Sequence, residues 1–336
     1  MSKLVQVETV FSYSEHLPVV DVWLVVDILR ATTMIVTWFA AGGAELYPTV
    51  SVDAARSLAE HLKEEGGQPL LMGEQNAVAP QGFDLGNSPL GITPEMIQKY
   101  SCAVMATTNG TKAISKAASM GTPVLIACAR NAFAALDLAL TKGNRLGIFC
   151  SGRKGRPAWD DTLCAGLFIA ILKEHFPDIR LADSSRLALL AWSEPKNFKS
   201  SLKTADHAIF LEKIGYGDDI AFAAEIDAVR VVPELHELPS GNETRLVLRP
   251  GMVPEKPLAL NRQASWALKI LEKNSRGGEI FSEPTALIRL LAPNRTEDDA
   301  LSDFSPMAEG RHSPGNVFFG GELYRRRRRN KVKRTS

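Results

Sequence analysis

The chain has 336 residues, 45% of them hydrophobic and 23% charged, and a formal net charge of +1. This composition is that of a soluble globular protein, and the length suggests about two domains. The small net charge hides an asymmetry. Eight positive charges without a single acid lie between Arg325 and Arg334, which leaves the rest of the chain at −7. An acidic globule with a basic tail excludes a general nucleic-acid binder for the globular part.

The cysteines and the apolar segments indicate the cellular compartment of the protein. The four cysteines form no CxxC pair, which predicts buried, reduced thiols and excludes a zinc site; they are Cys102, Cys128, Cys150 and Cys164. Residues 1–10 lack the basic and apolar regions of a signal peptide. The apolar stretch 19–41 contains Asp27 and Arg30, which a membrane span would tolerate poorly. We therefore expect a cytoplasmic protein with no membrane span, and the sequence leaves a homo-oligomer open.

The stretch from Val22 to residue 41 predicts a strand, a polar turn and a helix. Val22–Val26 is a short, β-branched apolar run, residues 31–41 suit a helix, and Gly42 and Gly43 end it. Asp27 and Arg30 lie at the turn, outside the carboxyl end of the strand, where open α/β sheets place ligand chemistry. The simpler interpretation is that Asp27 caps the helix and Arg30 is solvated.

The same strand-to-helix pattern recurs and predicts the α/β class. Further strands are expected at 70–72, Cys102–Ala106, 123–127, 146–149 and 229–232. Helices are expected at 52–65, 112–119, 132–140, 160–172, 186–192, 201–211 and 218–225. Five successive strands end in polar residues suited to an anion or a metal ion, which indicates one shared site.

Two segments between these elements carry candidate ligand groups. The loop 75–94 is long for a compact domain and contains Asp84, Asn87 and Ser88, whose oxygens bind ligands or form Asx-turns. The run Thr107-Thr108-Asn109-Gly110-Thr111 precedes a helix, and its hydroxyls and backbone N–H groups suit a phosphate or sulfonate. It matches neither a Walker loop nor a GxGxxG fingerprint.

The strand-end inventory favours a particular chemistry. It comprises carboxylates, hydroxyls and arginines, namely Asp27, Arg30, Glu74, Asp84, the 107–111 run, Arg130, Ser151, Asp160 and Asp161. Carboxylate oxygens without His or Cys partners suit Mg²⁺, and Arg with hydroxyls suits a phosphoryl group. Together they predict metal-assisted phosphoryl transfer or hydrolysis. The six histidines are scattered and are expected at the surface.

The C-terminal third has a different character. Beyond residue 237, Pro, Gly and charged residues become frequent, with helical candidates at 262–273 and 284–291. Residues 294–336 have little apolar periodicity and end in the arginine block. We expect a catalytic domain over 1–236, a partly helical extension over 237–293 and a disordered basic tail over 294–336.

Several ordered motifs resemble one family. They are Val25-Val26-Asp27-Ile28-Leu29-Arg30-Ala31-Thr32-Thr33, Gly73-Glu74, Gly82-Phe83-Asp84-Leu85-Gly86-Asn87-Ser88-Pro89, the 107–111 run, Asn131-Ala132, Cys150-Ser151-Gly152, Asp160-Asp161 and Cys164-Ala165-Gly166. Between residues 19 and 233 the chain resembles the 2-phosphosulfolactate phosphatase (ComB) family. The resemblance implies a Mg²⁺-dependent hydrolase that converts 2-phosphosulfolactate to sulfolactate and phosphate, a step toward coenzyme M in some organisms. It also implies a three-layer α/β/α fold with a mixed, largely parallel sheet, plus a C-terminal extension.

Role assignments combine the resemblance with the residue chemistry. Asp27, Glu74 and Asp161 are assigned to Mg²⁺, with Asp160 and Asp84 as substitutes. Arg30, Thr32, Thr33 and the 107–111 run are assigned to the phosphoryl group, and Ser151 to substrate binding. Asn87, Ser88 and Arg130 are assigned to the carboxylate and sulfonate. Attack by water and formation of an aspartyl phosphate at Asp27 both stay open.

The chain departs from the family pattern at two places, and this keeps two other functions in view. Gln75 stands where the family usually has Arg, and Ser151 stands where it usually has Cys-Ala-Gly. A phosphatase for another small phosphorylated hydroxy acid is therefore one alternative. A non-catalytic protein that binds phosphorylated acids in the same anion sites is the other.

Overall fold

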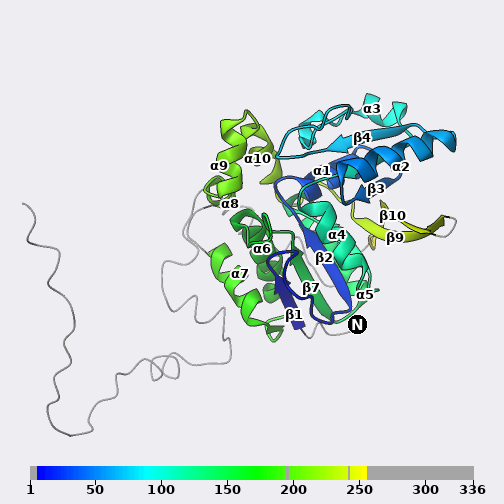
Figure 1. Ribbon diagram of the computed structural model, residues 1–336. Coiled ribbons are helices and arrows are strands. Elements are labelled where there is room, and N and C mark those ends of the chain that lie inside the picture. The colour runs from blue at the N-terminus through cyan, green and yellow to red at the C-terminus, as the bar shows by residue number, and fades with distance from the viewer. Residues whose placement is uncertain (1–5, 194–196, 241–242, 256–336) are drawn as a thin grey trace, which may run out of the picture. The chain divides into compact units, whose positions relative to one another are not determined.

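The computed structural model describes residues 6–193, 197–240 and 243–255 (Figure 1). At its centre lies strand β2 (Val22–Val26), whose five side chains are all buried. Trp23 and Val25 pack in one apolar cluster, whereas Val22, Leu24 and Val26 pack in another, because successive side chains of a strand point to opposite faces. A strand that is apolar on both faces needs cover on both sides, as in parallel sheets with flanking helices.

The described strands form one sheet in the order β4-β5-β3-β10-β9-β6-β2-β7-β1-β8. One parallel group contains β2 together with β6 (Val124–Ala127), β7 (Arg145–Cys150), β1 (Gln6–Val10) and β8 (Arg180–Leu181). The other parallel group contains β3 (Leu46–Thr49), β5 (Cys102–Ala106) and β4 (Pro69–Gly73). An antiparallel hairpin, β9 (Pro233–Ser240) and β10 (Glu243–Pro250), joins the groups by pairing Leu248 with Leu46 and Glu234 with Leu125.

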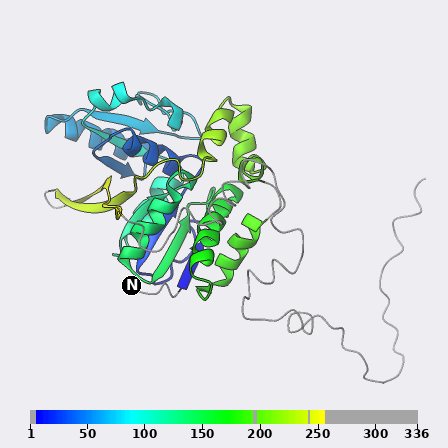
Figure 2. The same ribbon diagram turned by 180° about the vertical axis from the view of Figure 1, so that it is seen from behind.

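Helices cover both faces of each parallel group. The outer face of the β2 group carries α5 (Ala132–Lys142), α6 (Trp159–His175) and α7 (Asp183–Ser193). Three shorter helices, α8 (Phe198–Leu202), α9 (Asp206–Lys213) and α10 (Gly217–Ala223), pack on one another and beside α6, toward the carboxyl ends of the strands. The outer face of the β5 group carries α2 (Val52–Glu64), with Ala55, Ala59 and Leu62 packed inward. The two groups and their outer helices lie at opposite sides in Figures 1 and 2.

Two helices lie between the strand groups and follow the two strands that carry candidate ligands. They are α1 (Ala31–Ala40), after β2, and α4 (Gly110–Ala118), after β5. Their apolar residues share one cluster with Trp23 and Val25 of β2 and with Ala103 and Met105 of β5. This shared layer brings the carboxyl ends of β2 and β5 close together.

The predicted α/β/α architecture and mixed, largely parallel sheet are confirmed, with the refinement that α1 and α4 serve both strand groups. Most predicted strands and helices are found within a few residues of their expected bounds. The pattern did not reveal β1, β3, β8, β9, β10 or α3 (Pro94–Lys99). The helix expected at 201–211 is two helices, α8 and α9, separated by a turn at 203–205.

Two predictions near the end of the described chain are wrong. Residues 229–232 form no strand, because the Val229 N–H donates to the Arg130 carbonyl and the Val231 carbonyl accepts from Asn131 Nδ2. The expected domain boundary at 236 is the second, because this position lies inside β9 and the chain continues through β10 to Pro250. The helices expected at 262–273 and 284–291 and the basic tail at 294–336 lie outside the described residues.

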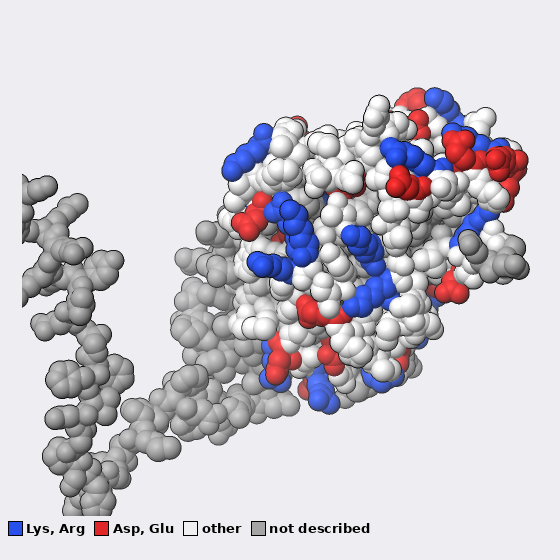
Figure 3. Space-filling view, in the orientation of Figure 1, with Lys and Arg blue, Asp and Glu red and all other residues white. Residues whose placement is uncertain are grey.

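The surface of the described residues carries charges of both signs. Over α2, exposed acidic and basic side chains gather and form ion pairs of Arg56 with Asp53 and of Lys63 with Glu60 (Figure 3). Within the described ranges, no helix combines the length and apolar character needed to cross a membrane.

Gly166 sets the distance between α6 and α7. A Cβ atom at this position would lie 2.2 Å from the Ala188 carbonyl oxygen and 2.6 Å from the Trp192 Cβ. We expect Gly166→Ala to lower the free energy of unfolding by about 2 kcal/mol, because two buried helices must separate. Urea denaturation measures this change, with Glu174→Ala on the exposed side of α6 as the control. Equal stability of the two variants would contradict the close approach.

Candidate active site

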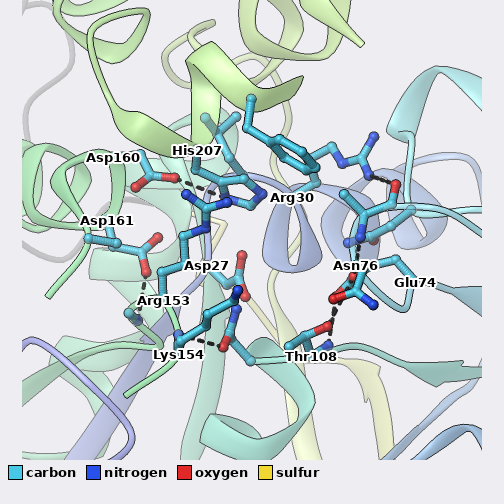
Figure 4. A pocket seen from close by; sticks show the side chains of 17 residues that line it. Asp27, Arg30, Glu74, Asn76, Thr108, Arg153, Lys154, Asp160, Asp161 and His207 are labelled. Atoms are coloured by element: carbon cyan, nitrogen blue, oxygen red, sulfur yellow. Dashed lines mark hydrogen bonds and ion pairs between the residues drawn. The ribbon is translucent and has the colours of Figure 1, made fainter. Parts of the chain in front are cut away.

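A pocket opens at the carboxyl ends of β2 and β5. Its volume of about 160 Å³ is below the roughly 300–1,000 Å³ of drug-sized ligand sites, so it suits a small molecule. Its polar lining comes from several segments and comprises Asp27, Arg30, Glu74, Asn76, Asn87, Thr108, Asn109, Arg153, Lys154, Asp160, Asp161 and His207. Figure 4 shows Asp160, Asp161 and His207 on one side, Glu74, Asn76 and Thr108 on the other, and Asp27 between them.

Asp27 is held by the turn that starts α1. Its Oδ1 accepts a hydrogen bond from the Ala31 N–H at 3.3 Å, and its own N–H donates to Thr32 Oγ1 at 3.1 Å. Thr33 Oγ1 donates to the Ile28 carbonyl at 2.7 Å. Thr32 and Thr33 are fully buried and bond to this turn. They shape the turn and lie outside the pocket lining, so this geometry gives their predicted contact with the phosphoryl group no support.

The start of α4 approaches Asp27 directly. A Cβ atom on Gly110 would lie 2.7 Å from Asp27 Oδ2, so this contact requires a glycine. Of the predicted anion-binding run, Thr108 and Asn109 line the pocket. Three of its amides are occupied. The Thr107 N–H donates to Thr111 Oγ1 at 3.2 Å, the Thr111 N–H donates to Thr107 Oγ1 at 3.0 Å, and the Thr108 N–H donates to Glu74 Oε1 at 2.6 Å. The start of α4 therefore offers fewer free backbone N–H groups to an anion than the sequence predicted.

Glu74 ties two loops together. Besides the Thr108 amide, it accepts hydrogen bonds at Oε2 from Thr108 Oγ1 at 3.1 Å and from the Ala77 N–H at 2.7 Å. Both carboxylate oxygens are thus occupied by protein donors. Glu74 positions the 107–111 run and the turn at 75–78, and its predicted role as a Mg²⁺ ligand has no support in this geometry.

Asp27, Asp160 and Asp161 form a buried acidic cluster. Burial raises the pKa of Asp27 to about 6, against the opposing effects of His207 and a Ser151 hydrogen bond. Burial and the charges of Asp160 and Asp27 raise the pKa of Asp161 well above its ordinary value. Holding three carboxylates out of water in one place stores electrostatic repulsion that a bound cation or proton would relieve.

Both carboxylate oxygens of Asp161 accept hydrogen bonds from the protein itself. Its Oδ1 accepts from the Ile28 N–H at 3.0 Å, and its Oδ2 accepts from the Gly152 N–H at 3.0 Å and from Ser151 Oγ at 3.2 Å. Ser151 therefore orients Asp161, in place of the substrate contact predicted for it. In the part of the chain that the structure describes, no three His, Cys, Asp or Glu side chains are placed to hold one metal ion together.

His207 is a site residue that the sequence did not indicate. It lies on α9, its side chain is 19% exposed, and its Nδ1 is 3.6 Å from Asp160 Oδ2. The prediction that all histidines lie at the surface is wrong for this one. A single histidine on an amphipathic helix carries no signal of its own, and the packing of α9 over the strand ends brings it into the pocket.

Arg30 lines the pocket but its charge is already paired. Its Nη1 lies 2.8 Å from Asp219 Oδ2, and both side chains are 2% exposed. Its Nη2 donates to the Ala77 carbonyl at 2.8 Å, and the guanidinium lies 4.3 Å from the centre of the Tyr216 ring. Ser88 Oγ donates to the other oxygen of Asp219 at 2.6 Å. Ser88 therefore supports Asp219, which corrects its predicted substrate contact.

Of the remaining predicted residues, one lines the pocket and two lie outside its lining. Asn87 lines the pocket, and its buried Oδ1 has no hydrogen-bond partner among the described residues, so it remains a candidate ligand group. Asp84 accepts from the Leu71 N–H at 2.9 Å and closes its loop onto β4, away from the pocket lining. Arg130 pairs with Glu225, lies 3.6 Å from the Phe222 ring centre and is outside the pocket lining, so this geometry gives its predicted contact with the substrate no support.

The site can now be compared with known proteins. The sequence model of the family described as 2-phosphosulpholactate phosphatase matches residues 9–238, which is well over half of the chain. The chain belongs to this family. The match starts inside β1 and ends inside β9, so it covers the strand ends that form the pocket.

Several relatives carry the name "Probable 2-phosphosulfolactate phosphatase". The chain is 38% identical to that of Clostridium novyi over 214 residues, which cover 63% of this chain and 88% of the relative. It is 34% identical to that of Deinococcus radiodurans over 230 residues, 67% of this chain and 92% of the relative. It is 35% identical to that of Thermus thermophilus over 225 residues, 66% of this chain and 90% of the relative.

The ion pair of Arg30 and Asp219 makes a stability prediction. Asp219→Asn leaves a buried guanidinium without its charge partner, so we expect the free energy of unfolding to fall by about 3 kcal/mol. Chemical denaturation measures this, and the neighbouring Asp218→Asn, at an exposed position, is the control and should change stability by less than about 0.5 kcal/mol. Equal values for the two variants would show that the pair contributes nothing.

For Asp27 we expect the opposite effect, namely that its replacement by a neutral residue stabilises the protein. Because the folded-state pKa of about 6 exceeds the ordinary 3.8, the folded protein becomes less stable as pH rises through this interval. In EDTA above pH 6, Asp27→Asn should raise the free energy of unfolding by up to about 3 kcal/mol. The gain should vanish below the ordinary pKa of 3.8. Denaturation of both proteins across this pH range tests it, and a variant less stable than the native protein at pH 7 would contradict it.

Proposed function

We propose that the chain is a phosphoric monoester hydrolase that removes phosphate from 2-phosphosulfolactate. The observation that carries the proposal is the placement of Asp27, a buried carboxylate next to the starts of α1 and α4, in a small pocket. The substrate follows from family membership and from the names of the relatives. In the reaction a water oxygen bonds to phosphorus, the ester P–O bond breaks, and the leaving alkoxide takes up a proton to give sulfolactate.

We further propose that the enzyme uses Mg²⁺. Asp27 and Asp160 would hold the ion, since Asp161 and Glu74 are occupied by protein donors. Mg²⁺ commonly binds one or two carboxylates together with substrate phosphate and water, so two carboxylates fit it. When bound, the ion would polarise the phosphoryl group and offset the repulsion between a phosphate dianion and the acidic cluster.

The setting of the reaction is proposed with it. The described cysteines are free and buried thiols, which supports the expected cytoplasmic location. Sulfolactate production places the reaction in sulfolactate metabolism, and toward coenzyme M where that cofactor is made. The pocket argues against the alternative of a protein that only binds anions. Asp27 and Asp160 are negatively charged and would repel a phosphate, so they weaken a site whose sole role is to bind one.

The test is phosphate release from 2-phosphosulfolactate by the purified protein, with Mg²⁺ and with EDTA. We expect metal-dependent release and a loss of at least about 10³-fold in Asp27→Asn, because the group nearest the phosphoryl site loses its charge. Asp218→Asn, which carries the same chemical change outside the pocket, should keep the native rate. Release that is equal in EDTA would overturn the Mg²⁺ proposal, and no release under either condition would overturn the hydrolase.

A further inference from the structure

We propose that Arg153 and Lys154 form a second anion subsite that binds the acidic groups of the substrate other than its phosphate. This inference rests on the proposed function, because it concerns the substrate of the same pocket. Neither residue was a candidate in the sequence. Both belong to the loop between β7 and α6, and both line the pocket together with Asp27 and Asp160 (Figure 4).

The loop that carries them has a fixed shape. The Arg153 N–H donates to the Arg156 carbonyl at 2.8 Å, and the Arg156 N–H donates back to the Arg153 carbonyl at 3.1 Å. Gly152, Lys154 and Gly155 have φ of 65°, 52° and 76°, values that make a tight reversal. A non-glycine residue such as Lys154 rarely adopts this conformation, so the surrounding bonds must stabilise it.

The same loop is bonded to the start of α4. The Lys154 N–H donates to the Asn109 Oδ1 at 3.1 Å, and Asn109 is the N-cap residue of α4. The backbone that carries the two cationic side chains is therefore fixed relative to the start of α4, which itself lies against Asp27. A rigid loop with two basic side chains is a suitable support for a site that must discriminate between small acids.

Charge balance shows that these two cations are available. Arg30 is paired with Asp219, and Arg130 is paired with Glu225 outside the pocket. Within the described residues, neither Arg153 nor Lys154 takes part in an ion pair; the Arg153 guanidinium lies 5.5 Å from the Phe210 ring centre. Four carboxylates line the pocket and repel a negatively charged ligand. Two unpaired cations in the same lining can bind the further negative groups of a ligand that carries more than one.

This subsite replaces two earlier assignments. Ser88 and Arg130, predicted to meet the carboxylate and sulfonate, lie outside the pocket lining. Gln75, where the family usually has Arg, is exposed and also lies outside it. Recognition of the second acidic group therefore belongs to Arg153 and Lys154, and the departure at position 75 does not alter it.

The experiment compares three phosphate esters with decreasing numbers of acidic groups. They are 2-phosphosulfolactate, 2-phospholactate and p-nitrophenyl phosphate. We expect Arg153→Gln with Lys154→Gln to lower kcat/KM for 2-phosphosulfolactate by about 100-fold or more, mainly through KM, because each charge-assisted hydrogen bond contributes about tenfold. The loss should be smaller for 2-phospholactate, and p-nitrophenyl phosphate should stay within about twofold. Arg156→Gln, an exposed cation of the same loop outside the lining, is the matched control.

Binding gives a second readout that does not depend on catalysis. Calorimetry in EDTA, where the proposed Mg²⁺-dependent hydrolysis does not consume the ligand, should show that the double variant binds 2-phosphosulfolactate about 100-fold more weakly than the native protein, while inorganic phosphate binds equally to both. Equal losses for all three esters, or unchanged binding of 2-phosphosulfolactate, would overturn the subsite. A native protein that releases no phosphate from any ester but shows this binding difference would overturn the proposed function and leave the subsite standing.

Discussion

The structure depends on the burial of a carboxylate between two helix starts. Asp27 ends the central strand β2, bonds to the first turn of α1, and touches the place where Gly110 begins α4. Positive helix ends favour a negative group, and burial disfavours it. Burial raises the pKa of Asp27 to about 6, against the charge of His207 and the hydrogen bonds from Ser151 and Ala31. Burying the Asp27 carboxylate in this pocket lowers the stability of the fold. Such unfavourable burial is typical of binding and catalytic sites.

The sequence reveals the centre of this site because its signals are local. The β-branched run Val22–Val26 and the polar residues after it predict both a buried strand and chemistry at its end. The same logic locates Glu74, the run at 107–111 and the pair Asp160 and Asp161. The structure brings Glu74, both aspartates and, from the run, Thr108 and Asn109 to one pocket. The rule that carboxyl ends of parallel strands share an edge is enough to group these residues.

The sequence does not reveal which of these groups face the ligand, because this depends on partners far along the chain. Asp219 looks like a helix-start acid until α10 folds against Arg30, 189 residues away. Glu74, Asp161 and Ser88 look like ligand groups until their oxygens meet protein donors or acceptors. His207 enters through tertiary packing alone. Arg153 and Lys154 left one usable trace, since they directly follow Ser151 and Gly152 at a strand end already assigned to the site.

The hairpin β9–β10 has a consequence for the synthesis of the chain. The family match stops at residue 238, yet β10 runs to Pro250 and pairs with both β9 and β3. On the ribosome, all strands of the two parallel groups emerge before this hairpin, and they become one sheet only when the hairpin pairs with β3 and β6. A fragment ended at the family boundary would leave the edges of β3 and β9 open to other chains, with the tendency to aggregate that open strand edges bring.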